Sequence, residues 1–136
     1  MLNRTLRGVF LLGVIIFAAA LVPRVGGVGT SAEPATAASP REIHLVVKDM
    51  TYFVEGQDSP NPTLHASPGE RIRLVLKNTD SGMSHDFTIQ GWKVHTRVLK
   101  GKGEDAVQFT VPDARGSHLY NCTPHSKMMT GTIVVQ

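Results

Sequence analysis

The sequence is poor in the residues that cross-link a small protein or give it a strong charge. Cys122 is the only cysteine among 136 residues, so no disulfide can form within the chain. Aromatic residues make up 6% of the sequence and charged residues 18%. A chain of this length holds one compact domain and hardly two, which excludes the large multidomain enzymes.

Charge of one sign is scarce once the first 38 residues are set aside. The whole chain has 14 Lys and Arg, 11 Asp and Glu and a formal charge of +3. Arg4, Arg7, Arg24 and the acidic Glu33 lie in residues 1–38, so the remainder has a balance of only +1. Phosphate binding needs Lys and Arg clustered on one face, and the composition therefore gives no support to nucleic-acid binding.

No uncharged run in the chain reaches the length of a membrane span. Gly8–Val22 has 15 residues and follows Arg4 and Arg7, whereas a spanning helix needs about 20 apolar residues. The pattern predicts a secretory signal peptide; an uncleaved N-terminal membrane anchor is the alternative, because the apolar stretch resumes at residues 26–29. We expect residues 1–38 to hold this segment and a flexible linker, and the rest of the protein to be exported to the periplasm or another extracytoplasmic space, either soluble or membrane-anchored.

From Arg41 onward, hydrophobic residues recur at a spacing of two. Ile72, Leu74 and Leu76 alternate with polar residues and with Val75 within residues 71–77, which predicts a half-buried strand. Similar runs occur at residues 43–48, 86–90, 106–111, 118–121 and 132–136, with turn signals between them. Six or more short strands without a convincing helix predict an all-β sandwich or small barrel over residues 41–136.

One loop near the C-terminus concentrates side chains that bind metals. Cys122, His125 and Met129 lie within eight residues, between two predicted strands. Two His and one Cys with a weak axial Met form the copper sites that transfer single electrons. The loop supplies only one His, so a second must come from elsewhere. His85 is the best candidate, because it follows a polar loop and opens the alternating segment 86–89.

These motifs resemble the cupredoxins, the family of azurin, amicyanin, pseudoazurin and plastocyanin, over residues 42–136. The segment Cys-Thr-Pro-His at residues 122–125 is similar to the amicyanin and pseudoazurin loop, and the spacing over residues 125–132 is similar to azurin. The resemblance implies a Greek-key β-sandwich that binds one type 1 copper ion through His85, Cys122, His125 and Met129. It favours Met129 over Met128, because the axial methionine of these relatives lies two residues before a glycine, here Gly131.

The resemblance also implies roles beyond the ligands. Asp86 stands where azurin and plastocyanin have an Asn that ties the first ligand strand to the cysteine loop, and it could still accept a hydrogen bond from Thr123. The function implied is a monomeric one-electron carrier between a protein donor and a protein acceptor, not an enzyme. An exported protein for copper storage, delivery or resistance is the alternative, since the same ligands could serve it.

Other readings of these residues are weaker. A single cysteine excludes a binuclear copper centre, which needs two, and the lack of any His-x-His pair argues against a multicopper oxidase or a nitrite reductase. A Cys–His hydrolase would have no room for a substrate domain in about 96 residues. The remaining histidines lack ligand spacing, and Met83 and Met128 are expected to pack rather than bind metal.

Overall fold

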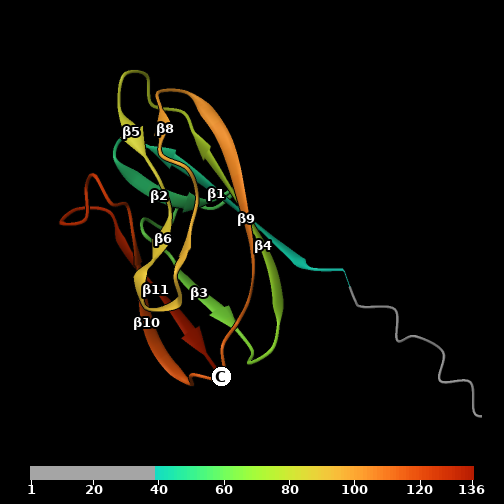
Figure 1. Cartoon of the computed structure of the whole chain (residues 1–136). Helices are drawn as coiled ribbons and strands as arrows, with labels where there is room; N and C mark the ends of the chain where they lie inside the picture. The colour runs from blue at the N-terminus through green and yellow to red at the C-terminus, as the bar shows by residue number, and fades with distance from the viewer. Residues whose placement is uncertain (1–38) are drawn as a thin grey trace, which may run out of the picture. The chain divides into compact units, whose positions relative to one another are not determined.

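The computed structural model describes residues 39–136, so the predicted signal or anchor segment and its linker lie outside the described residues (Figure 1). Within that part the chain forms eleven short strands and a single 3₁₀ turn, η1 (Gln90–Trp92). The all-β class expected from the two-residue periodicity is confirmed. Over the same residues, the model contains no helix with the length and apolar character that crossing a membrane requires.

Two sheets form the layers of a sandwich (Figure 1). The first has the order β2 (Thr51–Val54), β1 (Arg41–Lys48), β4 (Arg71–Asn78) and β9 (Gly103–Thr110). The second has the order β3 (Thr63–Ala66), β11 (Thr130–Val135), β10 (Gly116–Asn121), β6 (Thr88–Ile89) and β7 (Val94–His95). A two-stranded pair, β5 (Ser84–His85) with β8 (Leu99–Lys100), completes the fold.

Two parallel pairings tie together segments that are far apart in the sequence. β1 pairs in parallel with β4, and β3 pairs in parallel with the C-terminal strand β11. The other pairings are antiparallel, including that of β10 with β11. Because β10 and β11 run in opposite directions, the loop that joins them lies at the end of the sandwich opposite the C-terminus (Figure 1).

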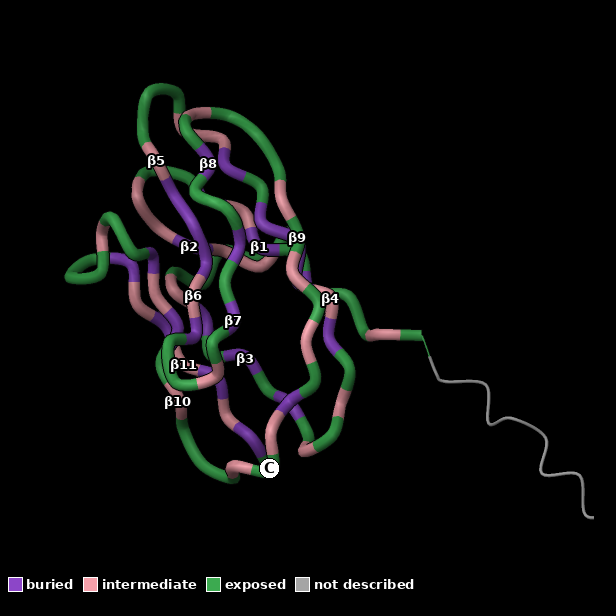
Figure 2. Tube along the Cα trace, in the orientation of Figure 1, coloured by how far each residue is buried: buried purple, intermediate pink, exposed green. Residues whose placement is uncertain are grey.

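The core lies between the sheets and is filled mainly by alternating residues of the strands (Figure 2). Ile72, Leu74 and Leu76 of β4 are fully buried, as the alternation predicts, and each such side chain contributes roughly 1.5–3 kcal/mol through burial. Val75, expected on the outer face, is buried as well. It lies in the middle of its sheet between His44 of β1 and Ala106 of β9, and these neighbours shield it.

The strand predicted over residues 86–90 is wrong as one continuous element. The chain forms β5 at residues 84–85, leaves strand geometry at Asp86 and Phe87, and resumes at β6. β5 pairs with β8, whereas β6 pairs with β7 and β10, so the chain passes from the small pair into the five-stranded sheet between them. The Phe87 N–H accordingly donates to the side-chain Oγ1 of Thr96 at 3.0 Å.

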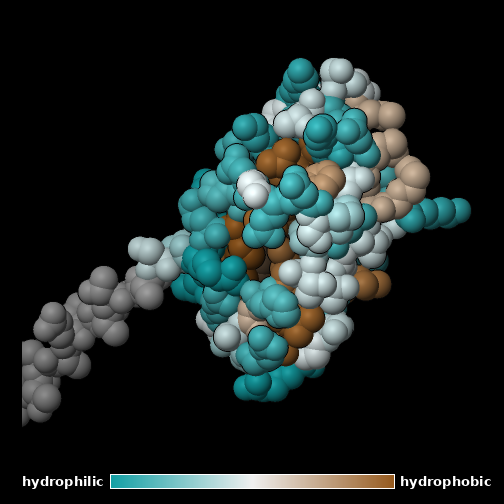
Figure 3. Space-filling view, turned by 180° about the vertical axis from the view of Figure 1, so that it is seen from behind, coloured by the Kyte–Doolittle hydropathy of each residue, from teal (hydrophilic) through white to brown (hydrophobic). Residues whose placement is uncertain are grey.

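On the face shown in Figure 3, hydrophilic side chains surround small hydrophobic areas. Met83 and Met128 are among the large apolar side chains that are exposed. The expectation that these two methionines pack is therefore wrong. Both lie in loops beyond the strand ends, where the sheets do not cover them.

Candidate metal centre

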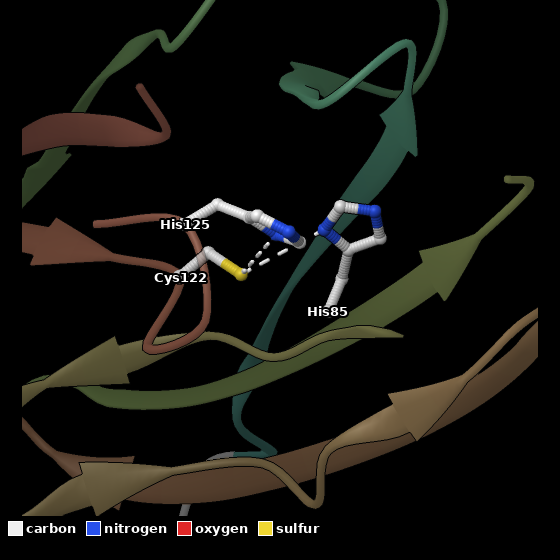
Figure 4. Close-up of side chains that lie close together, drawn as sticks. All are labelled: His85, Cys122 and His125. Carbon is white, nitrogen blue, oxygen red and sulfur yellow. Dashed lines mark hydrogen bonds between the residues drawn. The ribbon is translucent and has the colours of Figure 1, made fainter. Parts of the chain in front are cut away.

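Three side chains, two from one loop and the third from a distant part of the sequence, converge at one end of the sandwich (Figure 4). Sγ of Cys122 lies 3.7 Å from Nδ1 of His85 and 3.7 Å from Nδ1 of His125. All three donor atoms lie within 4.8 Å of one another, and the structure forms no other such group of His, Cys, Asp or Glu within residues 39–136. His85 and Cys122 are fully buried, whereas His125 is partly exposed.

The spacing of these atoms fits a single bound metal ion. Bonds of about 2.3 Å to a thiolate and about 2.0 Å to an imidazole, meeting at about 120°, place sulfur and nitrogen about 3.7 Å apart. Both sulfur–nitrogen distances in the structure have this value. Sγ is thus placed to share one ion with both Nδ1 atoms, and one thiolate with two imidazoles is the donor set of a type 1 copper site.

The loop that carries Cys122 and His125 is braced by its own backbone. The Cys122 N–H donates to the carbonyl of Met129 at 3.0 Å, and the Met129 N–H donates to the carbonyl of His125 at 3.0 Å. The His125 N–H closes a tight turn by donating to the carbonyl of Cys122 at 3.2 Å. These bonds fold residues 122–129 back on themselves and bring Met129 beside Cys122.

The two adjacent methionines of this loop differ sharply in exposure. Met129 is 0% exposed, whereas Met128 is 57% exposed. A buried thioether next to the cysteine is consistent with the fourth, axial position of a type 1 site. Together, His85, Cys122, His125 and Met129 form an arrangement consistent with one type 1 copper ion, and the assignment of Met129 as the axial ligand stays a prediction.

Gly131, which the sequence analysis used to choose Met129, has a steric reason to be glycine. It lies opposite Tyr120 in the β10–β11 register. A Cβ atom at this position would lie 2.2 Å from Cζ of Tyr120. The tyrosine ring is itself fully buried, with its hydroxyl donating to the carbonyl of Pro62 at 2.6 Å, so it has no room to move.

His85 is held at the end of β5 by contacts from several other segments. Asn78 Nδ2 donates to the carbonyls of Met83 and Gly101, which fixes the chain just before the histidine. Burial, and then the neighbouring His125, lower the pKa of His85 below its ordinary value, although Asp80 and Asp86 oppose the shift. The imidazole is therefore neutral near pH 7, the state in which the lone pair of its unprotonated nitrogen can bind a metal.

Asp80 lies against the far side of the His85 ring and was missed by the sequence analysis. Its Oδ2 is 3.3 Å from Nε2 of His85, at a direction that does not form a well-aligned hydrogen bond. The same carboxylate accepts the backbone N–H groups of Asp49 and Met50 at 2.9 and 3.1 Å. Partial burial raises the pKa of Asp80, but these N–H groups and His85 outweigh it and lower the pKa overall.

Asp86 makes the tie to the cysteine loop that the family resemblance implied. Its Oδ1 accepts the Thr123 N–H at 2.6 Å, and Thr88 Oγ1 lies 3.5 Å from its Oδ2. The buried hydroxyl of Tyr52, which sequence analysis also missed, donates to the backbone carbonyl of Asp86. The residue after His85 is thus fixed to the loop that carries the other ligands.

The Cys122 thiol has a pKa that disfavours nucleophilic attack. Burial raises the pKa of the thiol, and hydrogen bonds from the backbone N–H groups of Asp86 and His125 only partly offset that effect. The thiol is therefore protonated near neutral pH, and a bound cation has to displace this proton. A nucleophilic cysteine needs the opposite shift, toward a lower pKa.

The remaining histidines lie away from this cluster. His44 is exposed on β1, with Nε2 3.0 Å from Glu42 Oε2, and His65 and His95 are exposed on β3 and β7. His118 of β10 donates from Nε2 to the carbonyl of Ala114 and packs against Trp92. No local sequence signal could have identified Asp80 or Tyr52. Each reaches the site from another segment of the chain, and neither segment carries a motif that points to the site.

A family model described as a cupredoxin-like domain matches residues 24–135. No curated protein sequence matches the chain. Solved structures share its fold. One is auracyanin A, a "blue" copper protein from the photosynthetic bacterium Chloroflexus aurantiacus, at 18% identity and a TM-score of 0.57, with 72% of this chain and 100% of that chain covered.

Two further structures show how widely this fold is used. Auracyanin from Roseiflexus castenholzii is 16% identical with a TM-score of 0.57, covering 73% of this chain and 99% of that one. The multicopper oxidase McoA from Aquifex aeolicus is 15% identical with a TM-score of 0.58, covering 71% of this chain and 26% of that one. The same fold therefore occurs in small single-domain proteins and as part of larger oxidases.

Proposed function

The chain belongs to the family of cupredoxin-like domains, and from this premise we propose that it is a mononuclear type 1 copper protein that carries single electrons between protein partners. The observation that carries the proposal is the convergence of two imidazole Nδ1 atoms on the Cys122 sulfur, each at 3.7 Å. His85, Cys122 and His125 would hold the ion, with Met129 as a fourth, weaker ligand.

The rigidity of this site suits electron transfer. A copper ion held there supplies a reversible one-electron Cu(II)/Cu(I) couple. The chain's own part is to keep the donors in place in both states. The hydrogen bonds within residues 122–129 and the bond from Thr123 N–H to Asp86 hold the donors in one arrangement. Little atomic movement then accompanies the gain or loss of an electron, which makes the transfer fast.

We propose that the protein has no catalytic activity of its own. The raised pKa of Cys122 disfavours a nucleophilic role. The chain contains one cysteine and no His-x-His pair, so it lacks the ligands of the multinuclear copper centres found in oxidases. Likeness to an oxidase fold does not change this, because the ligands and not the fold decide the chemistry.

The proposal extends to location and partners. A signal or anchor in residues 1–38 would bring the domain outside the cytoplasm, as a monomer, either soluble or held at the membrane. The partly exposed edge of His125 is the side of the site nearest to solvent, and so the natural point of electron exchange with a donor and an acceptor. The near-zero charge of the domain gives no large field to steer either partner.

The experiment that tests the copper site is an absorption spectrum of the full chain after Cu(II) is added. We expect an intense visible thiolate-to-copper band that a mild reductant bleaches and reoxidation restores. Cys122→Ser should abolish the band, whereas His44→Ala, which removes an exposed histidine outside the cluster, should leave it unchanged. A band that survives Cys122→Ser would contradict the ligand assignment.

Reversible cycling separates electron transfer from copper storage or delivery. A carrier has to bind both oxidation states, and repeated reduction and oxidation should retain the metal. A handling protein favours one state and should release copper to a chelator in the other. Loss of the metal on a single reduction would therefore favour the storage, delivery or resistance role.

A further inference from the structure

The remote nitrogen of His85 is the one buried polar atom of the site without a well-aligned partner. Nε2 is buried on a side chain that is 0% exposed, and within residues 39–136 no group forms a regular hydrogen bond with it. The side chain is fully buried, so protein groups dominate the surroundings of Nε2. The charged oxygen against it is Oδ2 of Asp80, at 3.3 Å.

Asp80 is held in this position by contacts that do not involve the histidine. Its two oxygens accept the N–H groups of Asp49 and Met50, in the turn between β1 and β2. Both turn residues have positive φ, 50° and 57°, which points their N–H groups toward the carboxylate. The Asp80 N–H donates in turn to Oδ1 of Asn78 at 3.0 Å. These contacts fix the position of the Asp80 carboxylate independently of the His85 ring.

The second carboxylate near the histidine is occupied elsewhere. Oδ1 of Asp86 accepts the Thr123 N–H and its Oδ2 lies against Thr88 Oγ1. The two acids therefore have different contacts: Asp86 binds the cysteine loop, and Asp80 faces the imidazole of His85. Neither acid lies among the three converging donor atoms of the cluster.

We propose that Asp80 is a positioning residue for His85, which keeps the ring proton on Nε2 and so leaves the Nδ1 lone pair aimed at Cys122 and the metal. A neutral imidazole has one N–H, and the negative charge of a carboxylate 3.3 Å from Nε2 favours the proton on that nitrogen even without an aligned hydrogen bond. The negative charge also favours the more highly charged oxidised ion. This inference rests on the proposed copper function for the effect on the metal, but the position of the proton is a property of the chain alone.

The first test is made on the copper-free full chain by two-bond ¹H–¹⁵N correlation NMR of the His85 ring. We expect the proton on Nε2 and an unprotonated Nδ1 near neutral pH. A proton on Nδ1 would overturn the proposal. This measurement needs no variant and no metal, so its result stands even if the visible copper band is absent and the proposed function fails.

The second test compares Asp80→Asn with Thr79→Val in the copper-loaded protein by voltammetry. Thr79 is the matched control because its Oγ1 donates to the carbonyl of Val47 at 2.6 Å and ties down the same loop without facing His85. Asp80→Asn should weaken Cu(II) binding relative to Cu(I) about tenfold, which raises the potential by about 59 mV. Thr79→Val should lower stability and leave the potential unchanged.

Three outcomes of that comparison are informative. A raised potential in Asp80→Asn alone supports the role of the carboxylate. Equal shifts in both variants would assign the effect to a loosened loop, and no shift in Asp80→Asn with the band intact would show that the carboxylate does not act on the metal; either result overturns the proposal. If Asp80→Asn does not fold, the proton position in the unaltered chain decides.

Discussion

The site draws its ligands from two regions that are built in opposite ways. Residues 122–129 carry Cys122, His125 and the predicted axial ligand Met129 in one loop, which is held by hydrogen bonds among its own backbone groups. His85 stands alone at the end of a two-residue strand and is held by groups from other segments, among them Asn78, Asp80 and β8. The loop at residues 122–129 is stabilised by its own backbone, whereas the position of His85 is stabilised by contacts from other segments.

This difference explains what each region can tolerate. A self-braced loop depends on a few local bonds and on the strand that closes it, so its weak points are close in sequence. The position of His85 depends on the register of the strands around it, and a substitution many residues away in the sequence can therefore move its side chain. The four predictions below test this contrast, in order of expected effect.

The largest effect is expected where the loop is closed by β11. Gly131→Ala should lower the free energy of unfolding by about 3 kcal/mol, since the added Cβ would overlap the fixed ring of Tyr120. Urea denaturation of the metal-free protein measures this. Gly91→Ala is the control, because a Cβ there meets no atom within 4 Å, and its effect should stay within about 0.5 kcal/mol. Similar losses in both variants would refute the steric explanation.

The bond between the two regions comes next. Asp86→Ala should cost about 2 kcal/mol, because it removes the charged, buried acceptor of a part-buried hydrogen bond from the Thr123 N–H. Asp86→Asn keeps an oxygen that can accept the same bond and should recover more than half of the loss. The comparison fails if the alanine and asparagine variants unfold at the same urea concentration.

Within the loop, the two methionines should behave differently. Met129→Leu conserves volume and should change stability by less than about 1.5 kcal/mol. It should nonetheless raise the reduction potential by about 59 mV, a tenfold change in relative affinity, because the oxidised ion loses a donor. Met128→Leu alters an exposed side chain and should leave stability and potential unchanged. A shift confined to Met128→Leu would reverse the axial assignment.

The smallest effect concerns acids outside both regions. A hydrogen bond from Arg41 holds the pKa of Glu70 below its ordinary 4.5. Burial raises the pKa of Asp105, but the backbone N–H and guanidinium of Arg97 outweigh it and bring the pKa below 3.8. Because both pKa values are lower in the folded state, this stability is present above the unfolded pKa values and is lost as the pH falls below about 4.

Each of these two pairs should contribute less than about 1 kcal/mol, since both are partly exposed. Glu70→Gln and Asp105→Asn should flatten the dependence of unfolding free energy on pH between about 5 and 3. Neither change should alter the visible copper band at neutral pH. An altered band would mean that the two ligand regions are coupled to the rest of the sandwich more strongly than these contacts indicate.

Sequence patterns predicted the loop at residues 122–129 better than the segment around His85. Cys122 and His125 are separated by two residues in a loop between alternating strands, and local spacing was enough to bring them together. His85 was chosen from its place before an alternating segment, and the structure does bring it to the cysteine. The segment itself is not one strand, because the chain changes sheets at Asp86 and Phe87.

The features that were missed depend on contacts between distant segments. Asp80 lies in a polar turn, and only the parallel pairing of β1 with β4 brings it to the turn at Asp49 and Met50. Val75 alternates as an outward residue and is covered only by its neighbours in the sheet. Strands of two residues, such as β7 and β8, are too short to show a period.

The pairing of β3 with β11 also determines the order in which parts of the fold can form. Residues 63–66 cannot complete their sheet until residues 132–135, far along the sequence, have docked beside them. The same final strand pairs with β10 and so closes the loop at residues 122–129. Long-range pairings of this kind form late. The loop therefore takes its closed form only after β11 has docked between β3 and β10, and the arrangement of its donor atoms is one of the late products of folding.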